Sequence, residues 1–178
     1  YTVLVTPGSD GEVRVSLAAN VCIDAIGTGN AASSELIRQY DATKPTVVLT
    51  TSAANPTNQD FTTTFTFSEA VTGFSLGDIT VTNGSKSSFT AVSSTVYTVV
   101  VTPAADGEVK IEVGADVAID VAGNTNSAAA ALTRQYDSTK PVVTLTTSAA
   151  TPTNQPYTVT VTFSEPVTGF DAADVNVT

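Results

Sequence analysis

The 178 residues contain no histidine, no methionine and no tryptophan, and Cys22 is the single cysteine. Without histidine, the chain lacks the commonest general base and the commonest transition-metal ligand. The many serine and threonine hydroxyls therefore have no evident base to activate them as nucleophiles. One cysteine excludes both a disulfide framework and a thiolate metal cluster. We therefore expect that this protein is not an enzyme.

Positive charge is also scarce, since 7 lysines and arginines stand against 17 aspartates and glutamates, for a net charge of −10. This balance argues against nucleic acid as a partner, because phosphates require a basic surface. An acidic surface instead favours solubility and divalent cations. No apolar run approaches the roughly 18 residues of a membrane span, and no signal peptide leads the chain. We expect a soluble segment, excised from a longer protein, whose export signal lies elsewhere.

What the sequence does contain is an internal repeat, which outranks other sequence signals. Residues 1–82 return as residues 97–178 without a gap, with 49 identities in the 82 pairs, so the period is 96 residues. The stretch 83–96 is present only once. The predicted domains are 1–41, the C-terminal half of one repeat; 42–137, a complete repeat; and 138–178, the N-terminal half of the next.

Alternation of apolar and polar residues, bounded by turn residues, predicts short strands throughout the complete repeat. In residues 61–68, for example, Phe61, Thr63, Phe65 and Phe67 share one face. The strands are expected at 46–52, 61–68, 78–82, 89–92, 97–102, 108–113 and 129–136. Seven such strands without helical periodicity predict an all-β fold of tandem immunoglobulin-like β-sandwich repeats.

The joints between repeats carry the candidate chemistry. In a sandwich of this kind, the entering linker and two of the loops meet at one end. Around the complete repeat, this end collects Asp41 from the linker, Glu69 from a turn, and Asp120 with Asn124 and Asn126 from one loop. Converging carboxylates repel one another, and Ca²⁺ relieves that repulsion with oxygen ligands in a flexible geometry. The alternative is ordinary turn chemistry, because Asp, Asn and Gly are the residues that turns use.

The same positions recur in the partial repeats. Asp24 corresponds to Asp120, Asp137 to Asp41 and Glu165 to Glu69, so these are further candidate metal ligands. The first partial repeat differs at one position, because Thr28 stands where the complete repeat has Asn124. Asp10, which precedes Gly11, is interpreted as part of a hairpin turn at the opposite end of its repeat.

Several motifs together resemble the bacterial Ig-like repeats of large surface proteins and adhesins. They are Tyr40-Asp41-Ala42-Thr43-Lys44-Pro45 at the joint, Thr162-Phe163-Ser164-Glu165-Pro166-Val167 with Gly169-Phe170 and Asp174, Tyr97-Thr98-Val99-Val100-Val101-Thr102-Pro103 before Asp106-Gly107, and Asp120-Val121-Ala122-Gly123-Asn124. The resemblance implies tandem domains in an extracellular stalk, with Ca²⁺ near the domain joints and Asp41, Glu69 and Asp120 as its ligands. Lys44 and Lys140 stand where related repeats commonly have a small residue, so they either weaken a metal site or act as counter-ions.

We therefore expect a structural spacer of a secreted or cell-surface bacterial protein. The alternatives are a module that binds a glycan or protein receptor, and a self-assembling filament or sheath. The third follows from the partial repeats, which are expected to supply three strands each and to leave strand edges and half a core exposed. Either the two halves complete each other between copies of the chain, or the segment is a window on a longer array of neighbouring repeats.

Overall fold

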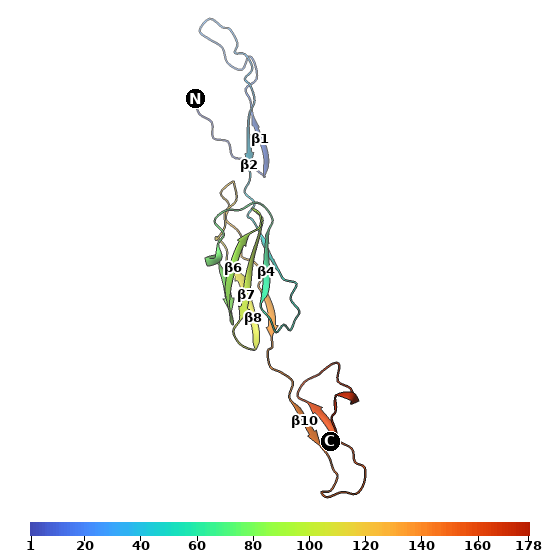
Figure 1. Cartoon of the computed structure of the whole chain (residues 1–178). Helices are drawn as coiled ribbons and strands as arrows, with labels where there is room; N and C mark the ends of the chain where they lie inside the picture. The colour runs from blue at the N-terminus through green and yellow to red at the C-terminus, as the bar shows by residue number, and fades with distance from the viewer. The chain divides into compact units, whose positions relative to one another are not determined.

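The computed structural model describes residues 1–178, which form two compact units, Tyr1–Asp137 and Ser138–Thr178. Within the first unit, residues 42–137 form a β-sandwich of two antiparallel sheets (Figure 1). One sheet has the order β3-β4-β7-β6, from β3 (Val47–Thr50), β4 (Phe61–Phe67), β6 (Gly84–Ala91) and β7 (Val96–Pro103). The other has the order β5-β8-β9, from β5 (Ile79–Thr82), β8 (Gly107–Val113) and β9 (Leu132–Tyr136). The predicted all-β, Ig-like fold is confirmed.

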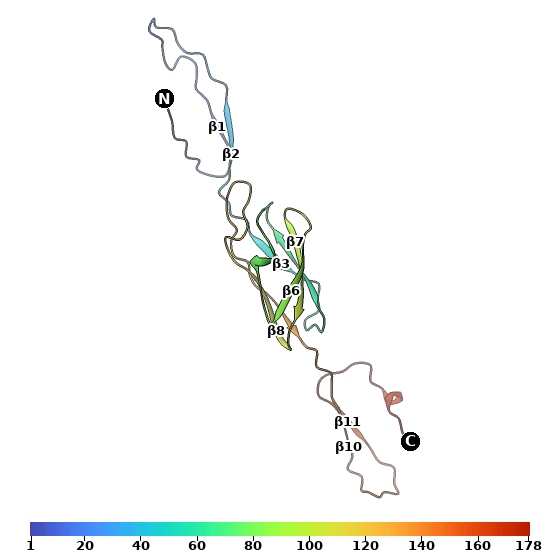
Figure 2. The same ribbon diagram turned by 60° about the vertical axis from the view of Figure 1, so that its left-hand side comes forward.

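Alternation along each strand places one set of side chains between the two sheets. Figure 2 shows the strands of the sandwich from a second direction. On β4 the side chains alternate between buried and more exposed, so that Phe61, Phe65 and Phe67 enter the core as predicted. Phe74, from the loop after β4, packs its ring against Phe65, Phe67, Phe89 and Tyr97 at centroid distances of 5.1–5.8 Å. Aromatic rings from β4, β6, β7 and the loop after β4 therefore pack together in the core of the sandwich.

Two strand predictions differ from the structure. The sequence predicts a strand at 78–82, which ends at Thr82 as β5 does, and a separate short strand at 89–92. Instead, Asn83 has a φ of 56° and the chain enters the eight-residue strand β6 directly at Gly84. A side chain at Gly84 would lie 2.9 Å from the carbonyl oxygen of Thr102, so this close approach requires glycine. At the other end of the domain, residues 129–131 lie outside β9, which begins only at Leu132.

Residues 1–41 form a hairpin of β1 (Gly11–Val15) and β2 (Leu36–Tyr40). The prediction of three strands in this segment was wrong, because residues 1–6 form no strand. Their counterparts in the complete repeat belong to β7, which pairs with β4 and β6. A central strand does not form when the strands that would flank it are absent from its own partial repeat.

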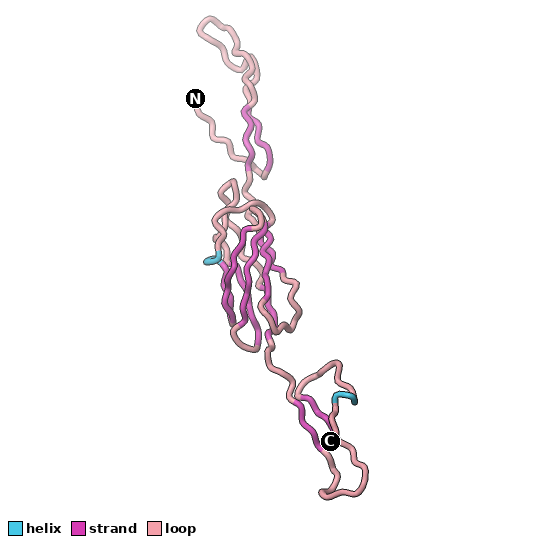
Figure 3. The backbone as a smooth tube through the Cα atoms, in the orientation of Figure 1, coloured by secondary structure: helices cyan, strands magenta, loops and turns pink.

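The second unit contains the hairpin of β10 (Val143–Thr146) and β11 (Thr160–Phe163), followed by the 3₁₀ turn η2 (Ala172–Asp174). Here too two strands form instead of three, because residues 175–178 correspond to β5, whose partner in the complete repeat is β8. Figure 3 shows η2 and its counterpart η1 (Leu76–Asp78) as the helical turns of the chain. Neither turn has the length or the apolar character that a membrane-crossing helix needs.

Candidate metal site

Three carboxylates from separate segments of the first unit converge at the joint before β3. Asp41 belongs to the linker after β2, Glu69 follows β4, and Asp120 lies in the loop between β8 and β9. One oxygen of each lies within 4.8 Å of the others. Asp41 and Glu69 are half-buried, and Asp120 is only 6% exposed. The structure thus brings together the three carboxylates that the sequence analysis placed at this end of the domain.

The Asp120 side chain is held by its own loop. Its Oδ1 atom accepts hydrogen bonds from the backbone N–H groups of Ala122, Gly123 and Asn124, at 2.8, 2.7 and 2.8 Å. Gly123 makes the tight turn possible with a φ of 100°, which side-chain-bearing residues rarely adopt. The turn chemistry and the carboxylate cluster therefore coexist, since Oδ1 shapes the turn while Oδ2 remains for other partners.

Asn124 connects this loop to the linker. Its Nδ2 atom donates to Oδ2 of Asp120 at 2.9 Å and to the backbone oxygen of Asp41 at 3.1 Å. The atom that faces the cluster is thus the amide nitrogen, which has no lone pair for a cation. In this placement, Asn124 positions two of the three carboxylate-bearing segments.

Asn126 has a different role from the one expected, because it does not face the carboxylates. It is fully buried, and its Oδ1 accepts from the N–H groups of Val117 and Ala118 at 2.9 and 2.8 Å. Its Nδ2 donates to the carbonyl oxygens of Gly114 and Ser127 at 2.9 and 2.8 Å. All of its hydrogen-bonding capacity at these atoms is used to hold the loop closed, so it is a structural residue.

Asp10 is a fourth carboxylate at the joint, and the sequence interpretation missed it. The side chain accepts hydrogen bonds from the N–H of Ala42 at 2.7 Å and from the hydroxyl of Thr43. As expected, Asp10 lies in the turn before β1, at the far end of its own repeat. That end adjoins the linker to the next repeat, so Asp10 reaches the joint. The register of the hairpin explains this position, because the pairing of Gly11 with Tyr40 places Asp10 beside the linker that follows Tyr40.

The four carboxylates have unequal electrostatic environments. Burial raises the pKa of Glu69 above its ordinary value, and the negative charges of Asp120, Asp41 and Asp10 raise it further. Burial also acts to raise the pKa of Asp120, but hydrogen bonds from the Asn124 side chain and the loop N–H groups outweigh it, so that pKa is lowered. No hydrogen bond to the Glu69 carboxylate lowers its pKa and so offsets this repulsion. Glu69 is thus the carboxylate that gains most from a cation.

Lys44, which was considered as an internal counter-ion, points to another partner. Its Nζ atom lies 3.7 Å from Oδ1 of Asp116, and that carboxylate also accepts from the hydroxyl of Thr125. The Thr125 hydrogen bond and then the Lys44 charge lower the pKa of Asp116. The linker lysine therefore pairs with Asp116, at the start of the loop between β8 and β9, and does not neutralise the three carboxylates of the cluster.

The remaining candidate ligands lie in the partial repeats. Asp24 is exposed and shapes a turn like that of Asp120, accepting from the N–H groups of Ile26 and Thr28 at 3.0 and 2.8 Å. Thr28 has no side-chain nitrogen to repeat the bridge made by Asn124. Asp137 belongs to the first unit, where its N–H donates to Thr57, and Glu165 belongs to the second unit. Their assignment as ligands stays a prediction.

Comparison with known families agrees with this architecture. The family model described as a bacterial Ig-like domain matches residues 41–136 and again residues 137–178. The chain belongs to the bacterial Ig-like domain family. Tandem bacterial Ig-like domains are typical of surface and secreted proteins, and no catalytic family matches the chain. No curated protein matches the sequence.

Proposed function

We propose that this chain is a structural spacer in the stalk of a secreted or cell-surface bacterial protein, with Ca²⁺ stiffening the joints between its Ig-like domains. The observation that carries the proposal is the convergence of Asp41, Glu69 and Asp120 within 4.8 Å. The three residues come from a linker and from two loops of the following domain. One ion bound by all three would tie the linker to that domain.

The ligand chemistry favours calcium over smaller or softer cations. Carboxylate oxygens suit hard cations, and Ca²⁺ accepts six to eight oxygens in flexible geometry, whereas Mg²⁺ demands a near-ideal octahedron. The chain has no histidine and the cluster contains no cysteine, so neither an imidazole nitrogen nor a thiolate is offered to a transition metal at this site. A divalent cation would also neutralise the repulsion that raises the pKa of Glu69.

A spacer also requires a linker with limited freedom, and the linker here is held from both sides. On the side of the preceding hairpin, Asp10 binds the linker at Ala42 and Thr43. On the side of the following domain, Ser68 Oγ accepts from the N–H of Thr46 at 3.0 Å, and Ser127 donates to the carbonyl oxygen of Pro45 at 2.9 Å. Pro45 itself is buried, and it restricts the residue before it to extended conformations. These bonds support a joint that resists bending, which the metal would reinforce.

Calcium titration of the Glu69→Gln variant tests this proposal. Two unit charges about 5 Å apart repel by about 1 kcal/mol in a water-like dielectric. Removing one charge of the cluster should therefore raise the metal-free stability by about 1–2 kcal/mol and weaken the Ca²⁺-induced increase in Tm. Glu69→Gln is suitable because no hydrogen bond contributes to the pKa of this carboxylate, so the substitution removes the charge without removing such a bond.

Glu108→Gln is the matched control, since it removes the same charge from an exposed position on β8. It should leave the Ca²⁺ response of the wild type intact. If chelator and Ca²⁺ leave the Tm of the wild-type chain unchanged, the metal part of the proposal is wrong. Small-angle scattering with and without Ca²⁺ then tests the spacer itself, because an independent hinge at the joint would contradict it.

A further inference from the structure

The chain enters and leaves the complete repeat at opposite ends of the sandwich. It enters through the linker that ends at Pro45, whose carbonyl oxygen accepts a hydrogen bond from Ser127. β3 then runs away from this joint, and residues 51–57 extend beyond it before β4 turns back. β9 runs parallel to that extension and ends at Tyr136, at the other end of the sandwich (Figure 1). A pull along the chain therefore reaches the domain through its first segment and its last strand.

These two segments are joined directly by hydrogen bonds at the far end of the domain. The N–H of Thr57 donates to the carbonyl oxygen of Gln135 at 2.9 Å, and the N–H of Asp137 donates to the carbonyl oxygen of Thr57 at 3.0 Å. The Oδ1 atom of Asn55 also accepts from the N–H of Gln135, at 2.8 Å. We call these three bonds the terminal clamp. Thr57 thus pairs with the residues on either side of Tyr136, which is the pattern of a parallel ladder.

We propose that the terminal clamp is the part of the domain that resists tension along the chain and sets the force at which the complete repeat unfolds. Under tension, residues 51–57 are drawn toward the linker before them, and β9 is drawn toward the repeat that follows it. Because the two segments are parallel, they can separate only by sliding past each other. Bonds that lie across the direction of sliding must break together, whereas a hairpin pulled open at its two ends loses its bonds one at a time.

The sheet topology leaves this clamp with a role that the other strand pairs cannot take. β3 pairs with β4 in one sheet, and β9 pairs with β8 in the other. The two sheets meet through packed apolar side chains, which offer no directional bonds. The terminal clamp instead ties the first segment to the last strand through backbone groups. The inference rests on the proposed spacer role only for its biological purpose, because the clamp requires no metal.

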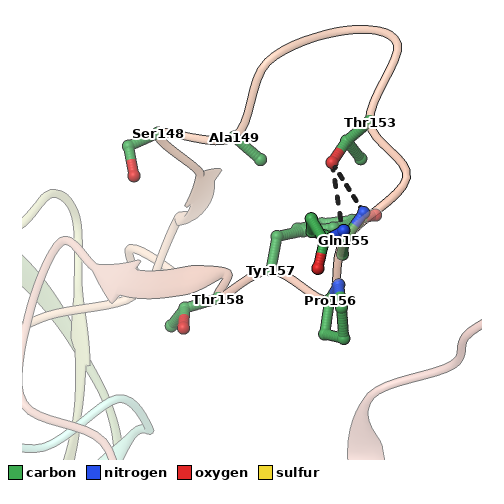
Figure 4. Close-up of a pocket in the computed structure, with 7 residues that line it drawn as sticks. All are labelled: Ser148, Ala149, Thr153, Gln155, Pro156, Tyr157 and Thr158. Atoms are coloured by element: carbon green, nitrogen blue, oxygen red, sulfur yellow. Dashed lines mark hydrogen bonds between the residues drawn. The ribbon is translucent and has the colours of Figure 1, made fainter.

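The loop that carries the clamp is shaped by its own sequence. The Thr57 hydroxyl accepts from the N–H of Gln59 at 3.3 Å and donates to its carbonyl oxygen at 3.4 Å. In the second unit, Thr153 makes the same two bonds to Gln155, at 3.2 and 3.3 Å, and Figure 4 shows this turn. A threonine turn of this kind needs only residues close in sequence, so it forms in both copies. In the complete repeat, it holds the backbone of Thr57 in place for the last strand.

Single-molecule pulling on the two ends of the full chain tests the proposal, because forced unfolding is governed by the unfolding rate. Chelator is present throughout, so the outcome is independent of any Ca²⁺ at the joint. The complete repeat is identified by its gain in length, about 300 Å for the 90 residues from 47 to 136. In the wild type this gain should occur in one step, because the clamp breaks as a unit. A first segment or last strand that peels away at lower force would overturn the proposal without any substitution.

Asn55→Ala removes one bond of the clamp from an exposed position, so the domain should still fold, which urea unfolding verifies. At constant force its unfolding rate should rise about fivefold, which corresponds to the net contribution of one hydrogen bond. Asn55→Asp keeps an acceptor oxygen at the same place and should retain the wild-type rate.

Thr102→Val is the matched control. It removes the hydrogen bond from the Thr102 hydroxyl to Asp60, at 2.8 Å, on the inner strand β7. Its equilibrium stability in urea should fall about as much as that of Asn55→Ala, while its unfolding rate under force stays within about twofold of the wild type. Equal acceleration by the two variants would indicate general destabilisation and overturn the proposal, as would an unchanged rate in Asn55→Ala.

Discussion

Replacing Asn126 by alanine should strongly destabilise the complete domain. The side chain is fully buried and makes four hydrogen bonds to the backbone of its own loop, all between 2.8 and 2.9 Å. A buried hydrogen bond contributes about 1 kcal/mol, and a partner left unpaired costs about 1–3 kcal/mol. Allowing for water that enters the vacated space, we expect a loss of about 3–4 kcal/mol of unfolding free energy. For a domain of this size, that loss lowers Tm by about 12–30 °C.

The repeat supplies a matched control in Asn30→Ala. Asn30 makes the same four backbone hydrogen bonds, between 2.7 and 3.0 Å, but in the half-repeat, where it is only half-buried. Water replaces these bonds easily, so the main transition should stay within about 0.5 kcal/mol of the wild type. Urea unfolding followed by far-UV circular dichroism measures both variants. Equal losses, or a loss below about 1 kcal/mol for Asn126→Ala, would refute the reasoning that burial multiplies the cost of these bonds.

Three further predictions use the same logic. Phe74→Ala should lower the unfolding free energy by about 3–5 kcal/mol, because it opens a cavity among four aromatic rings. Phe170→Ala, at the corresponding position of the second unit, which is 45% exposed, should change the main unfolding transition by less than about 0.5 kcal/mol, and equal effects of the two variants in urea unfolding would contradict this. Thr63→Val should stabilise the domain by about 1 kcal/mol, because the buried Thr63 hydroxyl has no hydrogen-bond partner and the second repeat has Val159 at this position; a lower Tm would show that the hydroxyl is satisfied. In chelator, the unfolding free energy should rise as pH falls toward 4.5, the ordinary pKa of Glu69, because the raised pKa lets the Glu69 carboxylate take up a proton in the folded state at a higher pH than in the unfolded state. Glu69→Gln should flatten that part of the profile of Tm against pH, and an unchanged slope would exclude Glu69 as its source.

Prediction from sequence succeeded where the signal was local or repeated. Alternation of apolar residues in 61–68 predicted both the strand β4 and the face that it buries, because side chains on a strand alternate with period two. The convergence of Asp41, Glu69 and Asp120 also followed from the sequence, because an Ig-like arrangement brings its linker and loops to known ends.

Prediction failed where the outcome depended on neighbouring strands. Residues 1–6 have the same pattern as β7 and still form no strand, because a strand needs a partner for its backbone hydrogen bonds. The short strand expected at 89–92 is instead the end of β6, which begins at Gly84, since β7 lies alongside to pair with it over this length.

The sequence by itself determined the 96-residue repeat, the all-β class and the acidic character of the joint, because these are properties of residue order and composition. Only the tertiary structure decided that Asn126 holds the loop, that Asp10 reaches the next joint, and that β6 is an edge strand. Each of these depends on which segments lie side by side in space. Burial is set by that proximity, which is why Asn126 and Asn30, with equivalent backbone hydrogen bonds, differ in how far they are buried.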